Sequence, residues 1–409
     1  MNLQDSAAAL LAGALVLAAS NSLFAADWPQ WRGPNRDGKV TGFNAPQSWP
    51  QQLSARWKVS VGKGDASPAL VGDNLYTFGR LGAEEVLMCL DATTGTTNWE
   101  KRYPANHVVT GPPASHGGPR SSPAVAEGKV CTLGVGGILS CFDARTGDLV
   151  WRKQSMEDYL GIHGDFETAM SPLIADGGCV VGVGVATNGG AICFNLTDGK
   201  VKWKWDGAGL TFGSPVTMTV NQTKMIVVVT AKFLAGLRLS DGKLLWQAPF
   251  QADNIAAPIV DGQVVFYGST GGSGNGMVAL KIEGQGDNFT ATKLWSNKDA
   301  GSRFSTAVLK DGLLYGYNNM FFCVNAQTGA TCWSTPARIG DNVAMLDAGS
   351  AIVGSGVKSQ LVVFKPGDKE YTELARIKLS TTDSWAHPVL SGNRIYIRDL
   401  DSVSLWTLD

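Results

Sequence analysis

The fold of this chain is decided by the stretch SSPAVAEGKV (residues 121–130) together with GGILSCFDARTGDLVW (residues 136–151). Short apolar segments alternate there with residues typical of turns, which predicts four short strands. Pro123 opens the first strand, where a missing backbone N–H matters least. Glu127-Gly128 supplies the positive φ angles that a tight hairpin between the first two strands requires. The unit is therefore predicted to be a four-stranded antiparallel meander.

The last turn of the unit has the form Asp-x-x-Thr-Gly-x-x-x-Trp, and it recurs along the chain. Its glycine permits the turn, its polar residues bond the turn backbone, and its tryptophan is expected to pack against the neighbouring unit. The equivalent positions on successive fourth strands are Trp57, Trp99, Trp151, Trp203, Trp246, Trp295, Trp333 and Ile377. The sequence therefore predicts eight outer strands.

The first strands also number eight, and the residues that open them are Ser67, Ser122, Ser171, Ser214, Ala257, Thr306, Val343 and His387. The last unit stops at Asp409, the position equivalent to Asp143, so it lacks an outer strand. Residues 54–61 form an outer strand with no unit before it. We therefore expect an all-β fold, an eight-bladed β-propeller of four-stranded antiparallel blades closed by the N-terminal strand.

The composition agrees with a folded β protein. Glycine accounts for 50 of the 409 residues, about 12%, against about 7% in average proteins. Charged residues make up 17%, against about 25% in average proteins. Thirteen tryptophans and an apolar fraction of 44% supply a core, which excludes disordered, collagen-like and coiled-coil structure. The net charge is −1 and no run of basic residues exists, so nucleic acid is not expected as a partner.

The N-terminal part of the chain differs from the repeats. Residues 1–26 resemble a secretory signal peptide in their apolar stretch, which predicts a periplasmic or secreted protein; an N-terminal helix or membrane anchor is the alternative. The strongly apolar part, residues 7–19, falls short of the ~20 residues that span a bilayer, so no transmembrane segment is expected after signal removal. No cysteine precedes Cys89, so a lipid anchor is not expected either.

Between this segment and the propeller, which we place at residues 53–409, residues 27–52 alternate tryptophan and proline too densely for a strand. They are expected to pack on the propeller through their tryptophans. Two interpretations are open: a clasp over the closure seam, or a lid across one mouth of the central channel.

The seven cysteines carry no recognisable metal or redox motif. No two are closer than nine residues, which eliminates paired zinc ligands, covalent haem attachment and CxxC chemistry. Several recur at one place in the repeat, so we interpret them as small buried hydrophobic residues. Disulfides across hairpins, Cys131 with Cys141 and Cys179 with Cys193, are the alternative, and the pairing stays open.

The unit with its Asp-x-x-Thr-Gly-x-x-x-Trp ending resembles the pyrroloquinoline-quinone (PQQ)-like propeller repeat, from residue 55 to the end of the chain. Two branches share this repeat: quinoprotein alcohol dehydrogenases, and the propeller subunit of the outer-membrane protein assembly machinery. The resemblance implies quinone and Ca²⁺ in the channel for the first branch, beside an adjacent Cys-Cys disulfide. It implies a lipidated cysteine for the second. This sequence has neither an adjacent Cys-Cys pair nor a cysteine that could carry the lipid. Because the Cys-Cys pair is missing, we expect no cofactor, PQQ included, and no metal.

The candidate ligand-binding residues lie on one predicted face of the propeller. In a meander, the connections from fourth to first strands and from second to third strands emerge on the same face, and the two longest connections carry most of the polar residues. Ordinary solvated loops are the alternative. The candidates are His107, His116, Arg120, His163, Asp165, Glu167, Arg303, Asp383 and His387.

His387 stands out because seven equivalent positions hold small or β-branched residues. It either plugs the channel by bonding neighbouring serine hydroxyls, or it projects into the mouth toward a ligand. Taken together, these features predict an exported, non-catalytic binding or scaffold propeller that recognises a protein or a small polar ligand. The alternatives are a quinone- or metal-dependent oxidoreductase, and a hydrolase or lyase acting on extracellular polymer through Asp165 and Glu167.

Overall fold

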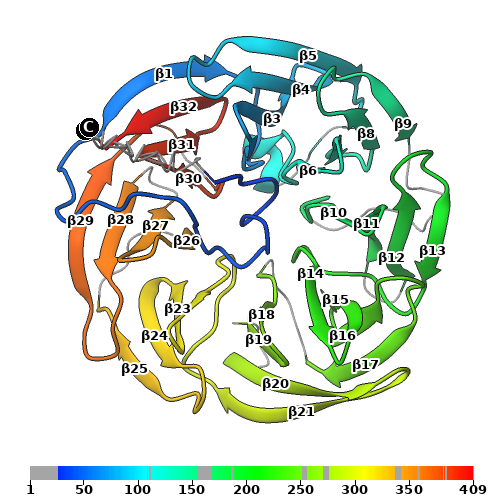
Figure 1. The fold of residues 1–409 in the computed structure, drawn as a ribbon, viewed down its shortest axis with the longest axis vertical. Coiled ribbons are helices and arrows are strands. Elements are labelled where there is room, and N and C mark those ends of the chain that lie inside the picture. The colour runs from blue at the N-terminus through cyan, green and yellow to red at the C-terminus, as the bar shows by residue number, and fades with distance from the viewer. Residues whose placement is uncertain are drawn as a thin grey trace, which may run out of the picture.

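A computed structural model describes residues 26–107, 109, 112–154, 168–185, 188–250, 256–269, 276–336, 342–356, 360–380, 382 and 385–408. Within these residues the elements are strands, apart from one short 3₁₀ helix, η1 (Pro112–His116). The strands form eight four-stranded antiparallel sheets, which are arranged as blades around a central channel (Figure 1). The predicted eight-bladed propeller is confirmed.

The blades are numbered 1 to 8 by their innermost strands. These strands are short, and all but β26 begin one residue after the proline or equivalent position; they are β2 (Ala69–Val71), β6 (Ala124–Ala126), β10 (Leu173–Ala175), β14 (Val216–Val220), β18 (Ile259–Asp261), β22 (Val308–Lys310), β26 (Val343–Asp347) and β30 (Val389–Ser391). The second strands are β3 (Asn74–Leu81), β7 (Lys129–Leu133), β11 (Gly178–Val185), β15 (Thr223–Val229), β19 (Val264–Ser269), β23 (Leu313–Asn318), β27 (Ile352–Gly356) and β31 (Arg394–Arg398).

The third and fourth strands complete each blade. The third strands are β4 (Glu84–Asp91), β8 (Leu139–Asp143), β12 (Asn188–Asn195), β16 (Phe233–Arg238), β20 (Gly276–Gln285), β24 (Met320–Asn325), β28 (Gln360–Lys365) and β32 (Ser402–Thr407). The outer strands are β5 (Thr97–Pro104), β9 (Leu149–Lys153), β13 (Val201–Trp205), β17 (Leu244–Pro249), β21 (Asn288–Asn297), β25 (Thr331–Ser334), β29 (Thr372–Lys378) and, for blade 8, β1 (Ser54–Ser60).

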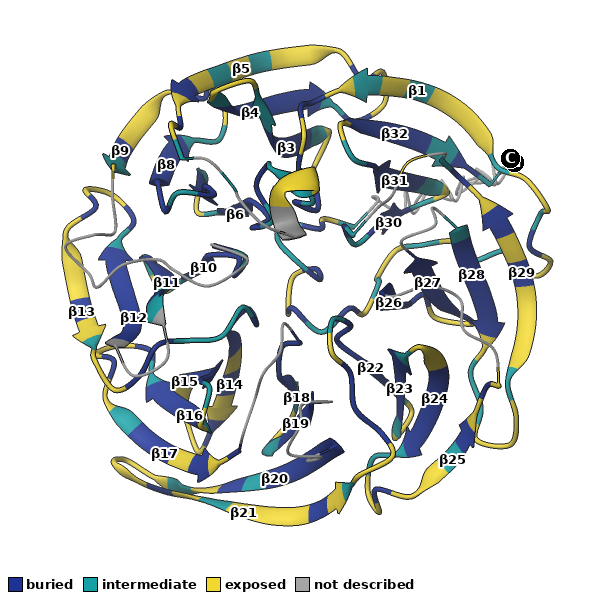
Figure 2. Cartoon of the chain, turned by 180° about the vertical axis from the view of Figure 1, so that it is seen from behind, coloured by how far each residue is buried: buried dark blue, intermediate teal, exposed yellow. Residues whose placement is uncertain are grey.

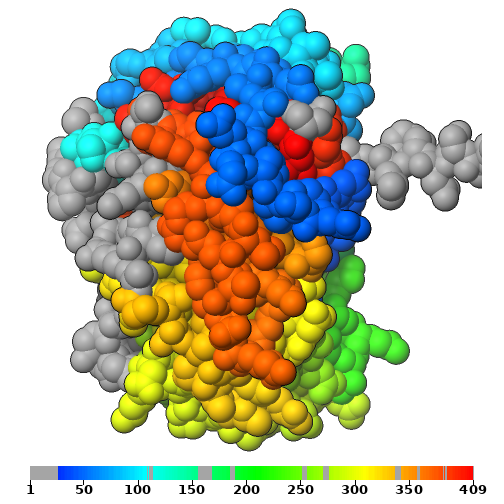
Figure 3. Space-filling model, turned by 90° about the vertical axis from the view of Figure 1, so that its left-hand side faces the viewer, coloured from blue at the N-terminus to red at the C-terminus, as the bar shows by residue number. Residues whose placement is uncertain are grey.

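Blade 8 joins the two ends of the chain as predicted. The strand β1 pairs antiparallel with β32, with Trp57 opposite Leu405 and Val59 opposite Val403. In Figure 3 the blue N-terminal residues lie against orange and red C-terminal residues on one side of the molecule. Because β1 covers the edge of β32, the ring closes with the same four-stranded blade throughout.

Outer-strand tryptophans such as Trp99 and Trp151 dock their blades on the next one. Gly147, in the last turn of blade 2, has a positive φ of 71°, and a Cβ there would lie 2.6 Å from the Trp99 ring of blade 1. Trp151 of blade 2 is buried, and its Nε1 donates to the backbone oxygen of Leu196 in blade 3 at 2.9 Å. The glycine of the repeated turn therefore both forms the turn and makes room for the preceding tryptophan. The apolar core consists of clusters that bridge neighbouring blades.

Six of the seven cysteines are buried, Cys332 is half-buried, and all seven are free thiols. They fill the core as the spacing predicted. No helix in the described part of the chain is long and apolar enough to cross a membrane.

Residues 26–44, which we call the N-terminal plug, cross one end of the channel (Figure 1). Trp28 forms a β-bridge with Leu70 of blade 1, and the oxygen of Pro29 accepts from the Val125 N–H of blade 2 at 2.8 Å. Farther along, Lys39 and Phe43 form bridges with blades 7 and 8. The plug therefore spans the channel opening from blades 1 and 2 to blades 7 and 8.

Two arginines of the plug reach the inner strands. Arg32 donates to the backbone oxygens of Thr306 and Ala307 in blade 6 at 3.0 and 2.8 Å, and to that of Met345 in blade 7. Arg36 donates to backbone oxygens of blades 3 and 4. Both side chains are buried, and burial lowers their pKa values, to about 10 for Arg32 and about 9 for Arg36. Both are therefore charged at neutral pH.

Candidate functional site

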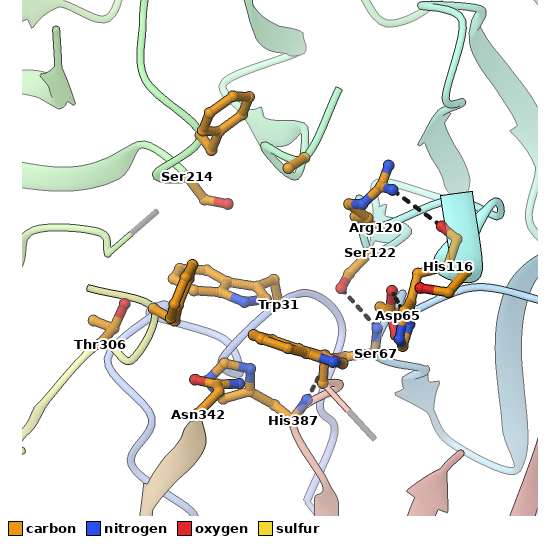
Figure 4. Close-up of a pocket in the computed structure, with 15 residues that line it drawn as sticks. Trp31, Asp65, Ser67, His116, Arg120, Ser122, Ser214, Thr306, Asn342 and His387 are labelled. Atoms are coloured by element: carbon orange, nitrogen blue, oxygen red, sulfur yellow. Dashed lines mark hydrogen bonds and ion pairs between the residues drawn. The ribbon is translucent and has the colours of Figure 1, made fainter. Parts of the chain in front are cut away.

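A pocket of about 360 Å³ lies in the channel, above the plug, and takes lining residues from several blades (Figure 4). Trp31 of the plug belongs to its lining, while the helix η1 stands at the opposite face, toward the viewer in Figure 2. The pocket is lined by Trp31, Asp65, Ser67, Ser115, His116, Arg120, Ser122, Ala169, Phe212, Ser214, Phe304, Thr306, Asn342, Trp385 and His387.

Hydroxyls at the openings of the inner strands link the blades around the channel. The Oγ of Ser122 accepts the backbone N–H of Ser67 at 2.9 Å, and the Oγ of Ser171 accepts that of Ser122 at 3.0 Å. The same kind of hydrogen bond joins each further pair of neighbouring blades in which the next blade has a serine or threonine at the opening of its inner strand. We call these five groups the inner-ring hydroxyls: Ser67, Ser122, Ser171, Ser214 and Thr306.

The ring of links is interrupted where the repeat lacks a hydroxyl. Val343 cannot use the His387 side chain in this way, and its N–H donates instead to the Oγ of Ser305 at 3.1 Å. That hydroxyl in turn donates to the Oδ1 of Asn342 at 2.8 Å. A serine or threonine at the opening of an inner strand is therefore a connector between blades, which explains why a hydroxyl recurs there in the sequence.

An acid and a base meet at the pocket wall. Asp65 follows β1, and its backbone N–H donates to the oxygen of Pro119 at 2.8 Å, which ties this segment to the end of the connection carrying η1. The Nδ1 of His116 lies 3.0 and 3.1 Å from the two carboxylate oxygens of Asp65. Arg120 donates to the backbone oxygen of His116 at 3.0 Å. This cluster holds one cation and a carboxylate–imidazole pair at the pocket.

His387 opens β30 and lines the pocket beside Trp31, with ring centroids 5.6 Å apart in an edge-on arrangement. Its backbone N–H donates to the Oγ of Ser67 at 2.8 Å. Its Nε2 is buried and has no hydrogen-bond partner among the described residues. Burial, with a smaller contribution from the Arg32 charge, holds the imidazole pKa well below its usual value. The imidazole is therefore neutral at pH 7.

Aromatic rings form the apolar part of the pocket. Trp385 lies edge-on to His116 at 6.3 Å between centroids and edge-on to Phe304 at 5.5 Å. Trp31 and Phe212 add two more rings. The pocket therefore combines an apolar body with polar groups that come from the strand openings and from η1.

The structure brings three of the predicted site residues, His116, Arg120 and His387, to this pocket. Arg303 is exposed and lies over the Phe304 ring at 4.9 Å, outside the lining. His107 is half-buried beside Gly136 of blade 2, and its backbone oxygen accepts from Arg80, also outside the lining. The remaining candidates lie outside the described residues: His163, Asp165, Glu167 and Asp383.

Sequence reasoning missed Asp65, Trp31 and the role of the inner-ring hydroxyls. The serine before proline is visible in the repeat, but sequence reasoning considers its hydroxyl only as a partner for His387 and not as a link between blades. Asp65 precedes Ser67 by two residues, as Arg120 precedes Ser122. Comparing these equivalent offsets would have placed both side chains at the same mouth.

The comparisons with known proteins agree on the fold. Quinohemoprotein alcohol dehydrogenase from Comamonas testosteroni is similar with a TM-score of 0.68 and 13% identity, covering 93% of this chain and 80% of that one. BamB from Moraxella catarrhalis gives 0.59 and 15%, covering 87% and 99%. The computationally designed Ika8 protein gives 0.61 and 12%, covering 88% and 100%. At these identities the likeness shows the fold alone.

The sequence itself matches a protein-family model. No curated protein sequence matches the chain. The model described as outer membrane protein assembly factor BamB matches residues 36–171 and 108–335, which together span well over half of the chain. The chain therefore belongs to this family of PQQ-like repeat β-propellers.

Proposed function

We propose that this chain is an exported binding protein without catalytic activity, which recognises a small polar ligand, alone or as part of a partner protein, at the open mouth of its channel. The observation that carries the proposal is the pocket itself. Asp65, His116 and Arg120 converge there from two separate segments, beside aromatic rings and a buried imidazole nitrogen with no described partner. A polar atom of a ligand would satisfy that nitrogen.

Export is part of the proposal. It rests on the apolar residues 7–19 and on the likeness to the family whose model is described as an outer membrane protein assembly factor. A fusion of residues 1–30 to a reporter that is active only outside the cytoplasm tests it, with residues 27–56 as the control fusion. Reporter activity from the control alone, or from neither fusion, would contradict export.

The pocket does not match the quinone site that the resemblance implies. Its lining contains no cysteine, and no group of three His, Cys, Asp or Glu side chains in the described part of the chain is arranged to hold a metal ion. We therefore propose a function without PQQ. Added PQQ and Ca²⁺ should give neither stoichiometric binding nor alcohol-dependent dye reduction.

Purification of the mature protein under native conditions, followed by denaturation and mass spectrometry of the released small molecules, tests the binding function. An absorbance spectrum taken before denaturation separates the alternatives, because a bound quinone absorbs beyond the protein bands. We expect a released molecule without such a band. A quinone band with dye reduction would replace the proposal with an oxidoreductase.

A further inference from the structure

We propose that the channel pocket is an oxyanion site, which takes the carboxylate of an organic acid or an inorganic oxyanion such as phosphate. This inference rests on the proposed function and specifies the charge of the ligand. It is carried by the inner-ring hydroxyls and by the two buried arginines of the plug, neither of which the binding proposal uses.

The inner-ring hydroxyls have a donor that no described residue uses. Each of them accepts one backbone N–H from the preceding blade. A hydroxyl also carries one proton to donate, and none of the five donates a hydrogen bond to any described residue. Four of them line the pocket, and all four are at least 96% buried: Ser67, Ser122, Ser214 and Thr306. Donors that converge without an acceptor favour a ligand rich in acceptor oxygens.

The charge below the hydroxyls is positive. Arg32 is bonded to the backbone oxygens of Thr306 and Ala307, and Arg36 to those of Ser171 and Pro172, so both guanidiniums sit against the residues that bear the hydroxyls. Among the described residues neither has a carboxylate within ion-pair distance, and Asp37 offsets only part of the desolvation of Arg32. Buried charges are usually paired, so two guanidiniums with carbonyl partners alone create a field that attracts an anion.

Among the described residues that line the pocket, the other charges do not cancel this field. Asp65 is the one carboxylate among the lining residues, and both of its oxygens contact the His116 imidazole. Arg120 adds a further positive charge at the wall. Besides the four inner-ring hydroxyls that line the pocket, the Nε2 of His387 is a further polar atom that could hydrogen-bond to a bound oxyanion. The aromatic rings around Trp385 suit the apolar body of an organic acid.

The test compares two serines that make the same link between blades. Ser122 and Ser171 are both 1% exposed, and each accepts one backbone N–H at 2.9 to 3.0 Å. Only Ser122 lines the pocket. Ser122→Ala and Ser171→Ala should therefore lose similar stability, while only Ser122→Ala removes a donor from the site. Ligand-free full-length mature protein is titrated calorimetrically with benzoate, its neutral analogue benzamide, acetate and inorganic phosphate.

We expect at least one of the three anions to bind. Where benzoate binds, the affinity for benzamide should be at least about tenfold lower. Ser122→Ala should lower the affinity for the anion by about tenfold, while Ser171→Ala should leave that affinity unchanged. Binding of phosphate alone supports an inorganic source, and binding of benzoate an organic one. Equal binding of benzamide and benzoate, or equal effects of the two variants, would overturn the oxyanion inference and leave the binding pocket standing. If no anion binds and the native protein releases no small molecule on denaturation, both proposals fail.

Discussion

The two mouths of the channel are built differently. The mouth crossed by the N-terminal plug is sealed by residues outside the repeat. Among the described residues, the two arginines of the plug donate mainly to backbone oxygens at the inner strands. Their other acceptors lie within the plug: the backbone oxygen of Asp37 and the side-chain oxygen of Gln30. The opposite mouth is lined by side chains at the strand openings and by η1, and it leaves a pocket. The first arrangement gives the terminal guanidinium nitrogens of both arginines backbone acceptors, although the Nε of Arg32 and the Nε1 of Trp28 have no partner among the described residues. The second leaves hydroxyl protons and an imidazole nitrogen without described partners, which is the property expected of a binding site.

The contrast teaches that an arginine or histidine in this propeller must be judged by what it bonds. Arg32 is buried, His387 is half-buried with its Nε2 buried, and the two are close enough to interact electrostatically. Arg32 is held by four backbone oxygens, whereas the Nε2 of His387 has no hydrogen-bond partner among the described residues. Substitutions at the sealed mouth should therefore change stability, and substitutions at the open mouth should change binding.

Deletion of residues 27–61 is expected to have the largest effect, because it removes both the plug and β1 and exposes the edge of β32. Thermal unfolding followed by circular dichroism should show loss of most of the folding stability. Deletion of residues 1–25 alone is the control and should leave the melting temperature unchanged. If the longer deletion melts like the control, the ring does not depend on this closure.

Arg32→Leu should cost about 2–4 kcal/mol of unfolding free energy, because it leaves buried carbonyls of blades 6 and 7 without their donor. Arg145→Leu, at an exposed turn residue, should change it by no more than about 0.5 kcal/mol. Urea denaturation measures both. Equal effects would mean that the plug does not stabilise the channel through Arg32.

His387→Ser should reduce the loss of stability on acidification. Burial keeps the folded imidazole neutral, while the unfolded chain binds a proton below its usual pKa of 6.5. This contribution to stability is present above about pH 6.5 and is lost as the pH falls, by at most about 1.4 kcal/mol per pH unit. Urea denaturation at about pH 7 and about pH 5 should show a smaller difference for the variant. The same difference in both proteins would show that His387 is not held neutral.

Arg303→Ala should have the smallest effect. The guanidinium is exposed and contacts the Phe304 ring, a contact worth about 0.5–1 kcal/mol at most, and it does not line the pocket. We expect stability within that range and unchanged anion affinity in the titration described for Ser122. A loss of affinity comparable to that of Ser122→Ala would extend the site beyond the pocket.

The fold could be predicted because each blade repeats the same local signals. The turn glycine and the docking tryptophan, as at Gly147 and Trp99, recur in most repeats, with Ile377 in place of the tryptophan in blade 7, so blade number and closure follow from counting. The path of residues 27–52 could not be predicted, since it depends on long-range contacts such as Arg32 with Thr306. No periodic pattern encodes such a contact.

The candidate site could be predicted only in part. His116, Arg120 and His387 were found because they interrupt the repeat with polar side chains at one face. Arg303 has a similar sequence position, but its side chain turns onto the neighbouring Phe304 ring, a choice that depends on packing. Asp65 was missed because it lies in the short segment between β1 and β2, and its pairing with His116 arises only when the two segments meet.

The most direct test of the account is to fill the open pocket and look for the ligand. Wild-type protein and Ser122→Phe are purified natively in parallel and compared with Ser171→Ala, which loses an equivalent link between the next two blades without filling the pocket. Small molecules released on denaturation are quantified by mass spectrometry. The account predicts a stoichiometric molecule from wild type and from Ser171→Ala, and none from folded Ser122→Phe. The same molecule in equal amount from all three folded proteins would contradict it, because the ligand would then bind elsewhere.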